Sequence, residues 1–483
     1  MKACTPRAFA AALLLAMLAG LAACASTRGI APDAAPVDAS ALAGGAQLAQ
    51  EAADAAWPTQ RWWQAFGDPQ LDQLIDAAMS GSPDLRVARG RVRLALAQTG
   101  AAHADTLPSV DARASAQDTL FTRRSFIPPP YAGDFWWSND AAVDLRYTLD
   151  LWGGDAAALD AAKAGARASA AAEQAARLSL QSDIVQAYAQ LALQHERRAV
   201  LGEDLKNRRQ LVDIARQRLA AGIGTELELA QAQSGVPVAQ AEIDAVDQQI
   251  EILHHQLAAL SGQGPGAGDA LTPPRLTLPE ASLLPSHLPA ELLGRRPDIA
   301  MRRWRLEAAA QAIKVARARF YPNIDLVAAV GLQSLGFYHF LNDDALAANV
   351  GPAISLPIFE GGRLRANLDA RSAQYDEAVG EYDETLVRAL QQIADQVTTI
   401  RGLEKQQAQI DAALASAQRA HDLALRGYRA GLTDYLNVLN AESTLLAQRD
   451  RASGLRLQRL AAHARLIAAL GGGLPPAGDM QTP

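Results

Sequence analysis

Apolar and polar residues alternate along four short stretches of the chain, with the two-residue period of a β-strand. In "VDLRYTLDL", apolar side chains from Val143 to Leu151 alternate with acidic, basic and hydroxyl side chains. The other three stretches are residues 107–118, 324–332 and 349–358. This pattern fits an antiparallel sheet with one wet face. It also fits a transmembrane β-barrel built from segments of about 9–11 residues.

Long stretches rich in Ala, Gln, Leu, Glu and Arg separate these strands, and such residues favour helices. They predict helices over 84–106, 155–221, 225–260, 298–320, 363–430 and 434–470. At about 1.5 Å per residue, the two longest helices each span roughly 100 Å. Helices 225–260 and 298–320, placed end to end, nearly reach that length. We therefore expect a continuous and a broken helical column in each half, with the break at the Pro-rich linker.

The two halves of the chain match each other in sequence, which indicates an internal duplication. Residues 83–110, "PDLRVARGRVRLALAQTGAAHADTLPSV", match 297–324, "PDIAMRRWRLEAAAQAIKVARARFYPNI". Likewise "LAAGIGTELELAQAQS" at 219–234 matches "YRAGLTDYLNVLNAES" at 428–443, an offset of 209. The predicted parts are a signal peptide 1–23, an N-terminal arm 24–82, a first repeat 83–262, a linker 263–296, a second repeat 297–472 and a tail 473–483.

The N-terminus has the features of a secretory signal peptide. Lys2 and Arg7 precede an apolar run, residues 8–21, which is followed by "LAAC" ending at Cys24. These last residues resemble a bacterial lipobox, which implies cleavage before Cys24 and acylation of its thiol and amine. Several acyl chains would anchor the protein stably. An ordinary signal cleavage near Cys24 is the alternative.

Charge and motifs exclude several classes of function. The formal charge is −7, from 45 basic and 52 acidic residues, and losing Lys2 and Arg7 with the signal gives 43 − 52 = −9. Nothing here indicates a nucleic-acid partner. The eight histidines are scattered, and the sequence contains no HExxH, no GxSxG and no cysteine pair beyond the signal. We therefore expect no enzyme activity, no cofactor and no metal site.

The number of strands predicts an oligomer. After the signal, the sequence has no run of 18 or more apolar residues, so no membrane-spanning helix is expected. Four strands per chain are too few to close a membrane barrel, which needs at least about 8. A symmetric dimer or trimer would supply enough strands.

Several motifs in a fixed order resemble one family. They are "LAAC", "WWQAFGDPQLDQLI" (62–75), the paired "PD…LP" and "PD…YP" segments, "LPIFEGG" (356–362) and "YRAGLTDYLNVLNA". Together they cover essentially the whole chain after the signal. The chain resembles the outer membrane factors of tripartite efflux pumps, the TolC-like family, in its lipoprotein branch.

This resemblance implies a mixed α/β membrane protein that forms a homotrimer. A 12-stranded β-barrel in the outer membrane would continue as a 12-helix α-barrel in the periplasm, with each chain lipid-anchored. The implied partners are outer-membrane lipid, a periplasmic adaptor protein and an inner-membrane pump of the RND type. The channel would be a passive duct without a cofactor.

Two other functions stay open at this point: a type I protein-secretion duct, and a lipid-anchored periplasmic adaptor or coiled-coil structural protein. An adaptor would show one helical hairpin between β-sandwich halves, whereas this sequence predicts two hairpins with amphipathic strand pairs. The exported substrate cannot be read from the sequence.

The resemblance also places the two Gly-containing turns, at Gly222 and Gly431, at the periplasmic tip of the duct. Members of the family often carry a ring of acidic residues there, and a tyrosine that ties the closed turn to its neighbour. The matching residues here are Tyr428, Asn437 and Asn440 in the second repeat, and Glu228 and Gln231 in the first. Amides thus replace two carboxylates. Solvated turn residues without a gating role are the alternative, and Asp434 is expected to cap its helix.

Aromatic residues suggest further contacts. Trp62 and Trp63 are expected to anchor the N-terminal arm against the helices. The loops 121–137 and 335–344 are expected to face outside, and their aromatic residues would form an interfacial belt or pack the loops together.

Overall fold

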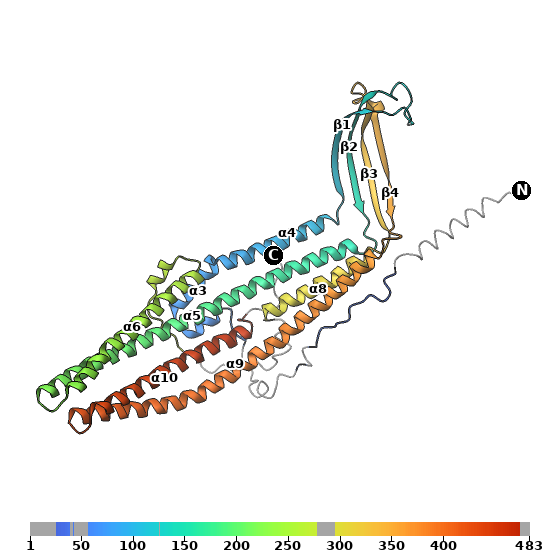
Figure 1. The fold of residues 1–483 in the computed structure, drawn as a ribbon. Helices are drawn as coiled ribbons and strands as arrows, with labels where there is room; N and C mark the ends of the chain where they lie inside the picture. The colour runs from blue at the N-terminus through green and yellow to red at the C-terminus, as the bar shows by residue number, and fades with distance from the viewer. Residues whose placement is uncertain (1–25, 39–41, 43–56, 125, 278–294, 474–483) are drawn as a thin grey trace. The chain divides into compact units, whose positions relative to one another are not determined.

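The computed structural model describes residues 26–38, 42, 57–124, 126–277 and 295–473 (Figure 1). They fall into two compact units. Unit 1 contains the described residues of 1–36, 92–169 and 302–382, and unit 2 contains those of 37–91, 170–301 and 383–483. The predicted signal peptide 1–23, Cys24, linker residues 278–294 and the tail from residue 474 lie outside the described residues.

The chain contains the same series of five elements twice, in the order helix, strand, strand, long helix, returning helix. The first series is α4 (Pro83–Ala104), β1 (Ser109–Leu120), β2 (Phe135–Thr148), α5 (Gly154–Ala220) and α6 (Glu226–Leu260). The second series is α8 (Pro297–Ala318), β3 (Asn323–Leu335), β4 (Leu346–Ser355), α9 (Arg363–Arg429) and α10 (Tyr435–Ala469). Each predicted helix and strand has a counterpart here, with ends that differ by a few residues for most of them.

Two strands differ from the prediction at their ends. β2 begins at Phe135, so Phe135, Trp136 and Trp137 belong to the strand and not to the preceding loop. Aromatic residues favour strands, and these three pair with Leu120, Thr119 and Asp118 of β1. β4 ends at Ser355 and not at residue 358, because Pro357 has no backbone N–H to continue the ladder.

In unit 1, the four strands form one antiparallel sheet in the order β1-β2-β3-β4 (Figure 1). The register places Val110, Leu145, Ala328 and Val350 in one row across all four strands. One face of the sheet is largely apolar. Its apolar members are Val110, Ala112, Ala114, Ala116 and Leu120 of β1; Phe135, Trp137, Ala141, Val143, Leu145 and Tyr147 of β2; Ile324, Leu326, Ala328, Val330 and Leu332 of β3; and Leu346, Ala348, Val350, Pro352 and Ile354 of β4.

The opposite face of the sheet is mainly polar or small. Arg113 of β1 forms ion pairs with Asp140 and Asp144 of β2, which are the diagonal neighbours of its paired residue. Near the strand ends, Thr148 donates a hydrogen bond of 2.8 Å to Asp325 of β3. The alternation predicted from the sequence therefore separates an apolar face from a charged one.

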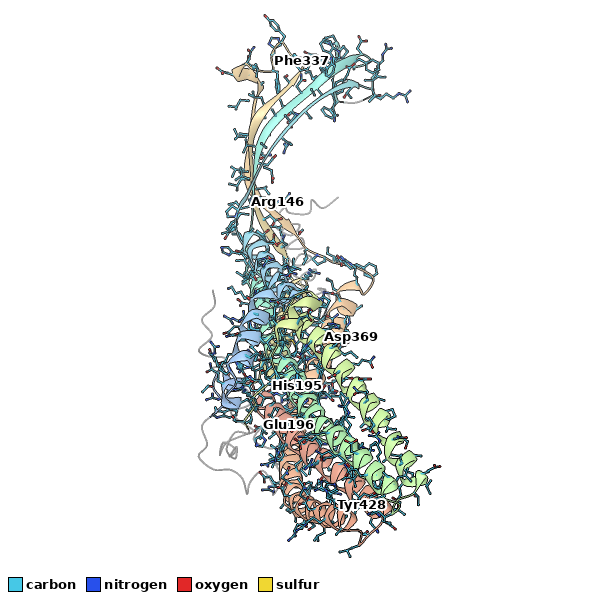
Figure 2. The ribbon with its side chains drawn as sticks, turned by 90° about the vertical axis from the view of Figure 1, so that its left-hand side faces the viewer. Arg146, His195, Glu196, Phe337, Asp369 and Tyr428 are labelled. Atoms are coloured by element: carbon cyan, nitrogen blue, oxygen red, sulfur yellow. The ribbon has the colours of Figure 1, made fainter. Side chains whose placement is uncertain are left out.

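The loops at one end of the sheet are held by aromatic contacts. The rings of Trp137 and Phe337 lie 5.3 Å apart, and those of Tyr131 and Trp136 lie 5.0 Å apart in an edge-to-face arrangement. Phe337 is labelled in Figure 2. Aromatic packing between loop and strand was one of the two predicted roles of these residues.

An extended segment, residues 26–38, runs along α9. Within unit 1, the Arg365 guanidinium donates to the backbone carbonyls of Ser26 and Arg28. Further along, the Asp376 carboxylate accepts from the backbone N–H groups of Asp33 and Ala34, at 2.9–3.2 Å. Side chains of α9 thus hold the main chain of this segment.

The core of unit 2 is built around the aromatic residues of the N-terminal arm. Trp62, Trp63 and Phe66 are buried in one cluster with residues of α5 such as Ile184 and Tyr188. Trp62 also donates a hydrogen bond of 3.2 Å to Gln181. The predicted anchoring role of the two tryptophans is therefore confirmed.

The broken helical columns are paired differently from the prediction. A Cβ added to Gly262, just after α6, would collide with the Gly81 carbonyl before α4, and one added to Gly471, just after α10, would collide with the Arg295 carbonyl before α8. Each returning helix therefore ends against the short helix of its own series. The predicted partner of 225–260, helix 298–320, is wrong, because helix lengths alone cannot distinguish two legs of equal length.

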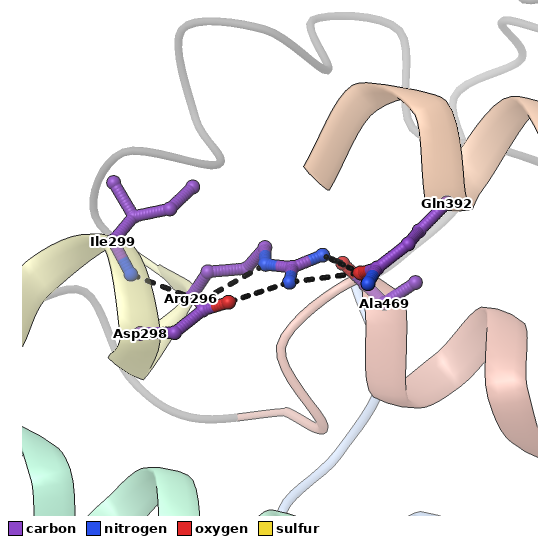
Figure 3. Close-up of polar contacts among 5 residues, drawn as sticks. All are labelled: Arg296, Asp298, Ile299, Gln392 and Ala469. Carbon is purple, nitrogen blue, oxygen red and sulfur yellow. Dashed lines mark hydrogen bonds and ion pairs between the residues drawn. The ribbon is translucent and has the colours of Figure 1, made fainter. Parts of the chain in front are cut away.

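Arg296 holds the second of these junctions together (Figure 3). Its guanidinium binds Asp298 at the start of α8 at 2.6 Å and Gln392 of α9 at 3.0 Å. It also donates at 3.0 Å to the carbonyl of Ala469, the last residue of α10. A cation at a helix C-terminus is favourable because the unpaired carbonyls carry partial negative charge. One buried side chain thus joins three helices of unit 2.

Among the described residues, no helix combines the length and the apolar composition needed to cross a membrane.

Candidate functional site at the two helical turns

The turn between α5 and α6 and the turn between α9 and α10 share one backbone design. In each, a glycine follows the long helix in the left-handed region, Gly222 with φ 76° and Gly431 with φ 74°. The next N–H closes a helix-ending bond to a carbonyl five residues back, from Ile223 to Arg218 at 3.0 Å and from Leu432 to Gly427 at 2.8 Å. Glycine is needed at both places because other residues rarely adopt positive φ.

Each returning helix begins with a side-chain cap. Thr225 accepts a hydrogen bond of 3.2 Å from the N–H of Glu228, and Asp434 accepts one of 3.1 Å from the N–H of Asn437. These bonds satisfy N–H groups that have no partner inside the helix. The capping role predicted for Asp434 is therefore confirmed.

The two turns lie together at one end of unit 2 and share a small apolar core, which we call the tip cluster. Figure 2 shows Tyr428 at this end of the hairpins. The buried members of the tip cluster are Leu211, Val212, Ala215, Ala232, Tyr428, Tyr435 and Val438. They come from all four helices α5, α6, α9 and α10, so the two hairpins are packed against each other at their turns.

Arg218 of α5 crosses from the first hairpin to the second. Its guanidinium carbon lies 4.7 Å from the centroid of the Tyr428 ring, a cation–π contact. It donates at 3.2 Å to the carbonyl of Tyr428 and at 3.2 Å to the carbonyl of Ile223 in its own turn. The same side chain thus binds both turns.

Tyr428 is the centre of this contact. Its side chain is 0% exposed. Burial and then the nearby Glu228 carboxylate raise the pKa of the Tyr428 hydroxyl, whereas Arg218 lowers it. The hydroxyl therefore stays neutral at physiological pH. Of the residues predicted for the site, the structure brings Tyr428 and Glu228 close together.

The predicted amide residues are exposed, unlike the buried Tyr428. Asn437 is exposed, and its side-chain amide donates locally, at 2.8 Å to both Thr433 and Asp434. Asn440 and Gln231 are exposed on α10 and α6. None of these three belongs to the tip cluster. Asn437 thus supports the start of α10.

Arg218 was not identified from the sequence. Its partners at the turn are a ring face and two backbone carbonyls, which leave no sequence motif. The repeat offers only a weak signal, because the position 209 residues later is Gly427, so the two copies differ here. Within the described ranges, no group of three or more His, Cys, Asp or Glu residues is arranged to hold a metal ion.

Comparison with known proteins identifies the class. The family model described as outer membrane efflux protein matches residues 74–263 and 288–472. The chain is 40% identical to the fusaric acid resistance protein FusA of Burkholderia cepacia, over 97% of this chain and 89% of that protein. It is 34% identical to the pyoverdine export outer membrane protein OpmQ of Pseudomonas aeruginosa, over 94% of each chain.

Solved structures agree. The outer membrane protein VceC of Vibrio cholerae aligns with a TM-score of 0.82 and 35% identity, covering 86% of this chain and all of that one. The chain therefore belongs to the outer membrane efflux protein family. It is an efflux channel subunit and not an enzyme, as the sequence predicted. Members of this family work with an adaptor and an inner-membrane pump in tripartite systems.

Proposed function

We propose that three copies of this chain form a passive export duct. A 12-stranded β-barrel would cross the outer membrane, and a 12-helix α-barrel would extend it through the periplasm. The observation that carries the proposal is the open sheet of unit 1, in which β1 and β4 each have one neighbouring strand within the described chain. Unpaired edges are a liability that barrel closure removes. Three sheets of four strands supply a barrel of twelve, within the range of known membrane barrels.

The two faces of the sheet support this arrangement. Large apolar side chains stand exposed on one face, with Val350 80% exposed and Val110 64% exposed. Exposed apolar groups cost free energy in water, but contact with lipid removes that cost. The opposite face, with Arg113 between two aspartates, suits a water-filled interior. The repeated order of elements also supports the predicted internal duplication, which would give each trimer a pseudo-sixfold wall.

Adjacent residues of β4 provide a matched test. Val350 lies on the apolar face and Asn349 on the polar face. A lysine at the lipid face of a membrane barrel costs about 2–4 kcal/mol near the bilayer centre, and lumen positions tolerate it. We expect Val350→Lys to block membrane assembly and Asn349→Lys to leave it intact. Light scattering of the detergent-purified protein should give the mass of three chains, and a monomer for the unmodified protein would refute the proposal.

The N-terminal segment supports a lipid anchor at Cys24. Ser26 is held by Arg365 in the first turn of α9, ten positions after β4 ends at Ser355. Ser26, which follows Cys24 by two positions in the sequence, is thus held near the base of the sheet, where the membrane surface is expected. Metabolic labelling with palmitate should mark the unmodified chain and not Cys24→Ser. Labelling of both chains, or of neither, would contradict the anchor.

We propose that this duct exports small molecules and takes an adaptor and an RND-type pump as partners. The names of two relatives, a fusaric acid resistance protein and a pyoverdine export protein, support small-molecule cargo over a secreted protein. Co-purification of an adaptor and a pump from cells with the native operon would test this. Recovery of a type I secretion ATPase in their place would favour protein export.

The turn residues are proposed to narrow the periplasmic entrance. Tyr428, Glu228, Gly222 and Gly431 would fix the closed turns, and Asn437, Asn440 and Gln231 would contribute amides to the pinch. Because amides replace carboxylates, the entrance should bind cations more weakly than an acidic ring would. The contact of Arg218 with both turns supports a closed state in which the two hairpins are held together.

A further inference from the structure

Two buried carboxyl groups, one from each hairpin, lie within interaction range of each other. Asp204 of α5 is 1% exposed and Glu442 of α10 is 3% exposed. Glu442 follows the same inward-facing stripe as Val438 and Leu445, which are buried apolar residues. A charged residue at such a position is unusual, because burying an unpaired charge is costly. The pair lies in unit 2, on two of the helices that form the tip cluster, but further from the turns.

The hydrogen bonds around this pair are incomplete when both groups are charged. Within the described chain, Oδ1 of Asp204 and both side-chain oxygens of Glu442 have no hydrogen-bond donor. Two carboxylates can only accept, so neither can satisfy the other. A proton on Glu442 resolves this, because the protonated group can donate to the neighbouring carboxylate.

The surrounding charges do not neutralise the pair. Arg208 donates at 2.6 Å to Oδ2 of Asp204, so one positive charge serves two acids. From α6, Glu242 faces the same arginine, and Tyr435 of α10 faces Glu442. On α9, at a similar distance from the turn, the buried His421 lies 3.7 Å from Asp422.

Burial and then the Asp204 carboxylate raise the pKa of Glu442 to about 7, against a weaker opposite effect of Arg208. Burial also raises the pKa of Tyr435 to about 12, so that hydroxyl stays neutral. An acid whose pKa is raised by packing favours the packed state while it is protonated. The proton therefore favours the packed state most below about pH 4.5, the ordinary pKa of a glutamate, and this advantage is lost as the pH rises to about 7.

We propose that a proton shared between Asp204 and Glu442 latches the second hairpin to the first, and that its loss to water drives the hairpins apart. In the latched state the Glu442 hydroxyl donates to Oδ1 of Asp204, whose other oxygen accepts from Arg208. Loss of the proton leaves two adjacent anions with one cation. Separation then admits water, which solvates both. The latch makes the duct wall sensitive to periplasmic pH, and its effect on conduction rests on the proposed channel function.

The internal repeat supplies a comparison for this pair. The positions offset by 209 residues from Asp204 and Glu442 are Ala413 and Gln233. Neither side chain can titrate. The matching positions on α9 and α6 therefore hold no second proton-sharing pair. The latch is therefore not a general feature of the duplicated design.

A spin-label distance tests the latch without any transport measurement. Lys206 of α5 and Thr444 of α10 are exposed positions beside the pair and can be replaced by cysteines that carry nitroxides. The labelled full-length chain is diluted with unlabelled chain, so that only distances within one chain are read. Between about pH 4.5 and about pH 7.5, a longer distance should appear as the pH rises, with its population ratio changing up to about tenfold per pH unit, the limit for one proton.

Three variants decide the interpretation. Glu442→Gln keeps the shape and donates like the protonated acid, so the short distance should persist at both pH values. Asp204→Asn should do the same and serves if Glu442→Gln does not fold. Glu242→Gln removes an exposed acid near the same arginine and should retain the transition. A pH-independent distance in the unmodified chain, or an intact transition in both Glu442→Gln and Asp204→Asn, would overturn the latch.

Conductance in planar bilayers separates this proposal from the channel function. If the unmodified chain conducts and its open probability rises with pH in parallel with the distance, the latch and the duct are both supported. If the chain does not conduct, the duct proposal fails while the distances still decide the latch. If it conducts and its distances ignore pH, the latch alone fails.

Discussion

The two turn-forming hairpins have nearly the same backbone and different chemistry. Both long helices contain 67 residues and both returning helices contain 35. Gly222 and Gly431 take almost the same φ. Yet the first hairpin supplies Arg218 and the second supplies the aromatic ring that it covers. A duplicated shape thus carries two complementary surfaces.

This difference shows how a duplicated unit can bind its own copy. Identical hairpins would offer like groups to each other, whereas a cation on one and a ring with a backbone carbonyl on the other attract. The Leu219 position illustrates the divergence, since it matches Tyr428 at the offset of 209 but is only half-buried. Substitutions at matched positions should therefore have unequal effects.

The largest difference in the loss of local stability is expected between Tyr428→Ala and Leu219→Ala. Tyr428 is fully buried among residues of both hairpins, and truncating a buried aromatic residue costs about 3–5 kcal/mol. Leu219 is half-buried and should cost less than about 2 kcal/mol. Hydrogen exchange of the amides in α9 and α10 near the turn measures the local opening free energy. Equal changes for the two variants would mean that Tyr428 is not the centre of the contact.

The next effect concerns the side chain that joins the turns. Arg218→Gln removes the cation–π contact and the positive charge that donates two hydrogen bonds. A hydrogen bond to a charged group contributes about 1.5–3 kcal/mol. Exchange should accelerate in both turns at once, and the open probability in bilayers should rise. Arg426→Gln is the control, because Arg426 is exposed and bonds within its own helix. Faster exchange confined to the first turn would show that Arg218 does not link the hairpins.

A smaller difference is expected at the helix caps. Both Thr225→Ala and Asp434→Ala remove an N-cap, which costs about 0.5–2 kcal/mol. Asp434 also accepts from the Asn437 side chain at 2.8 Å, and its charge favours the helix N-terminus. Asp434→Ala should therefore loosen the first turn of α10 more than Thr225→Ala loosens that of α6. The same exchange experiment compares them, and a larger effect at Thr225 would contradict this.

The periodic features of this fold were predictable from the sequence, and the contacts between elements were not. Strand alternation around Val143 and the Gly-containing turns have local causes, so their places could be read directly. The pairing of α6 with α4 depends on how the chain returns in space, and two legs of equal length gave no means to choose. The early end of β4 lies two residues before Pro357, a signal that the alternation concealed.

The candidate site divides in the same way. Family resemblance pointed to Tyr428 and Glu228, which the structure places together. It gave no reason to select Arg218, whose partners are backbone carbonyls, or Glu442, whose acid partner lies 238 positions earlier in the chain. Glu442 had one local signal, a charged residue at an inward position between Val438 and Leu445. Long-range pairs of this kind become visible only when the helices are assembled.

The smallest effect on stability should come from Asn440→Asp, which makes it the cleanest probe of the proposed pinch. Asn440 is exposed, and surface substitutions usually change stability by less than about 0.5 kcal/mol. Three added carboxylates around a narrow entrance would nevertheless attract cations strongly, because charges of one sign in a constriction focus the field. Single-channel recordings should show stronger block by divalent and trivalent cations.

Gln231→Glu is the matched variant for this probe, since Gln231 takes the Asn440 position in the first repeat. If the second hairpin lines the narrowest part of the entrance, Asn440→Asp should increase block more than Gln231→Glu. Equal increases would place both hairpins around the pinch. No gain of block in either variant would remove Asn440 and Gln231 from the entrance, and would leave the contact of Arg218 with Tyr428 as the remaining candidate for closure.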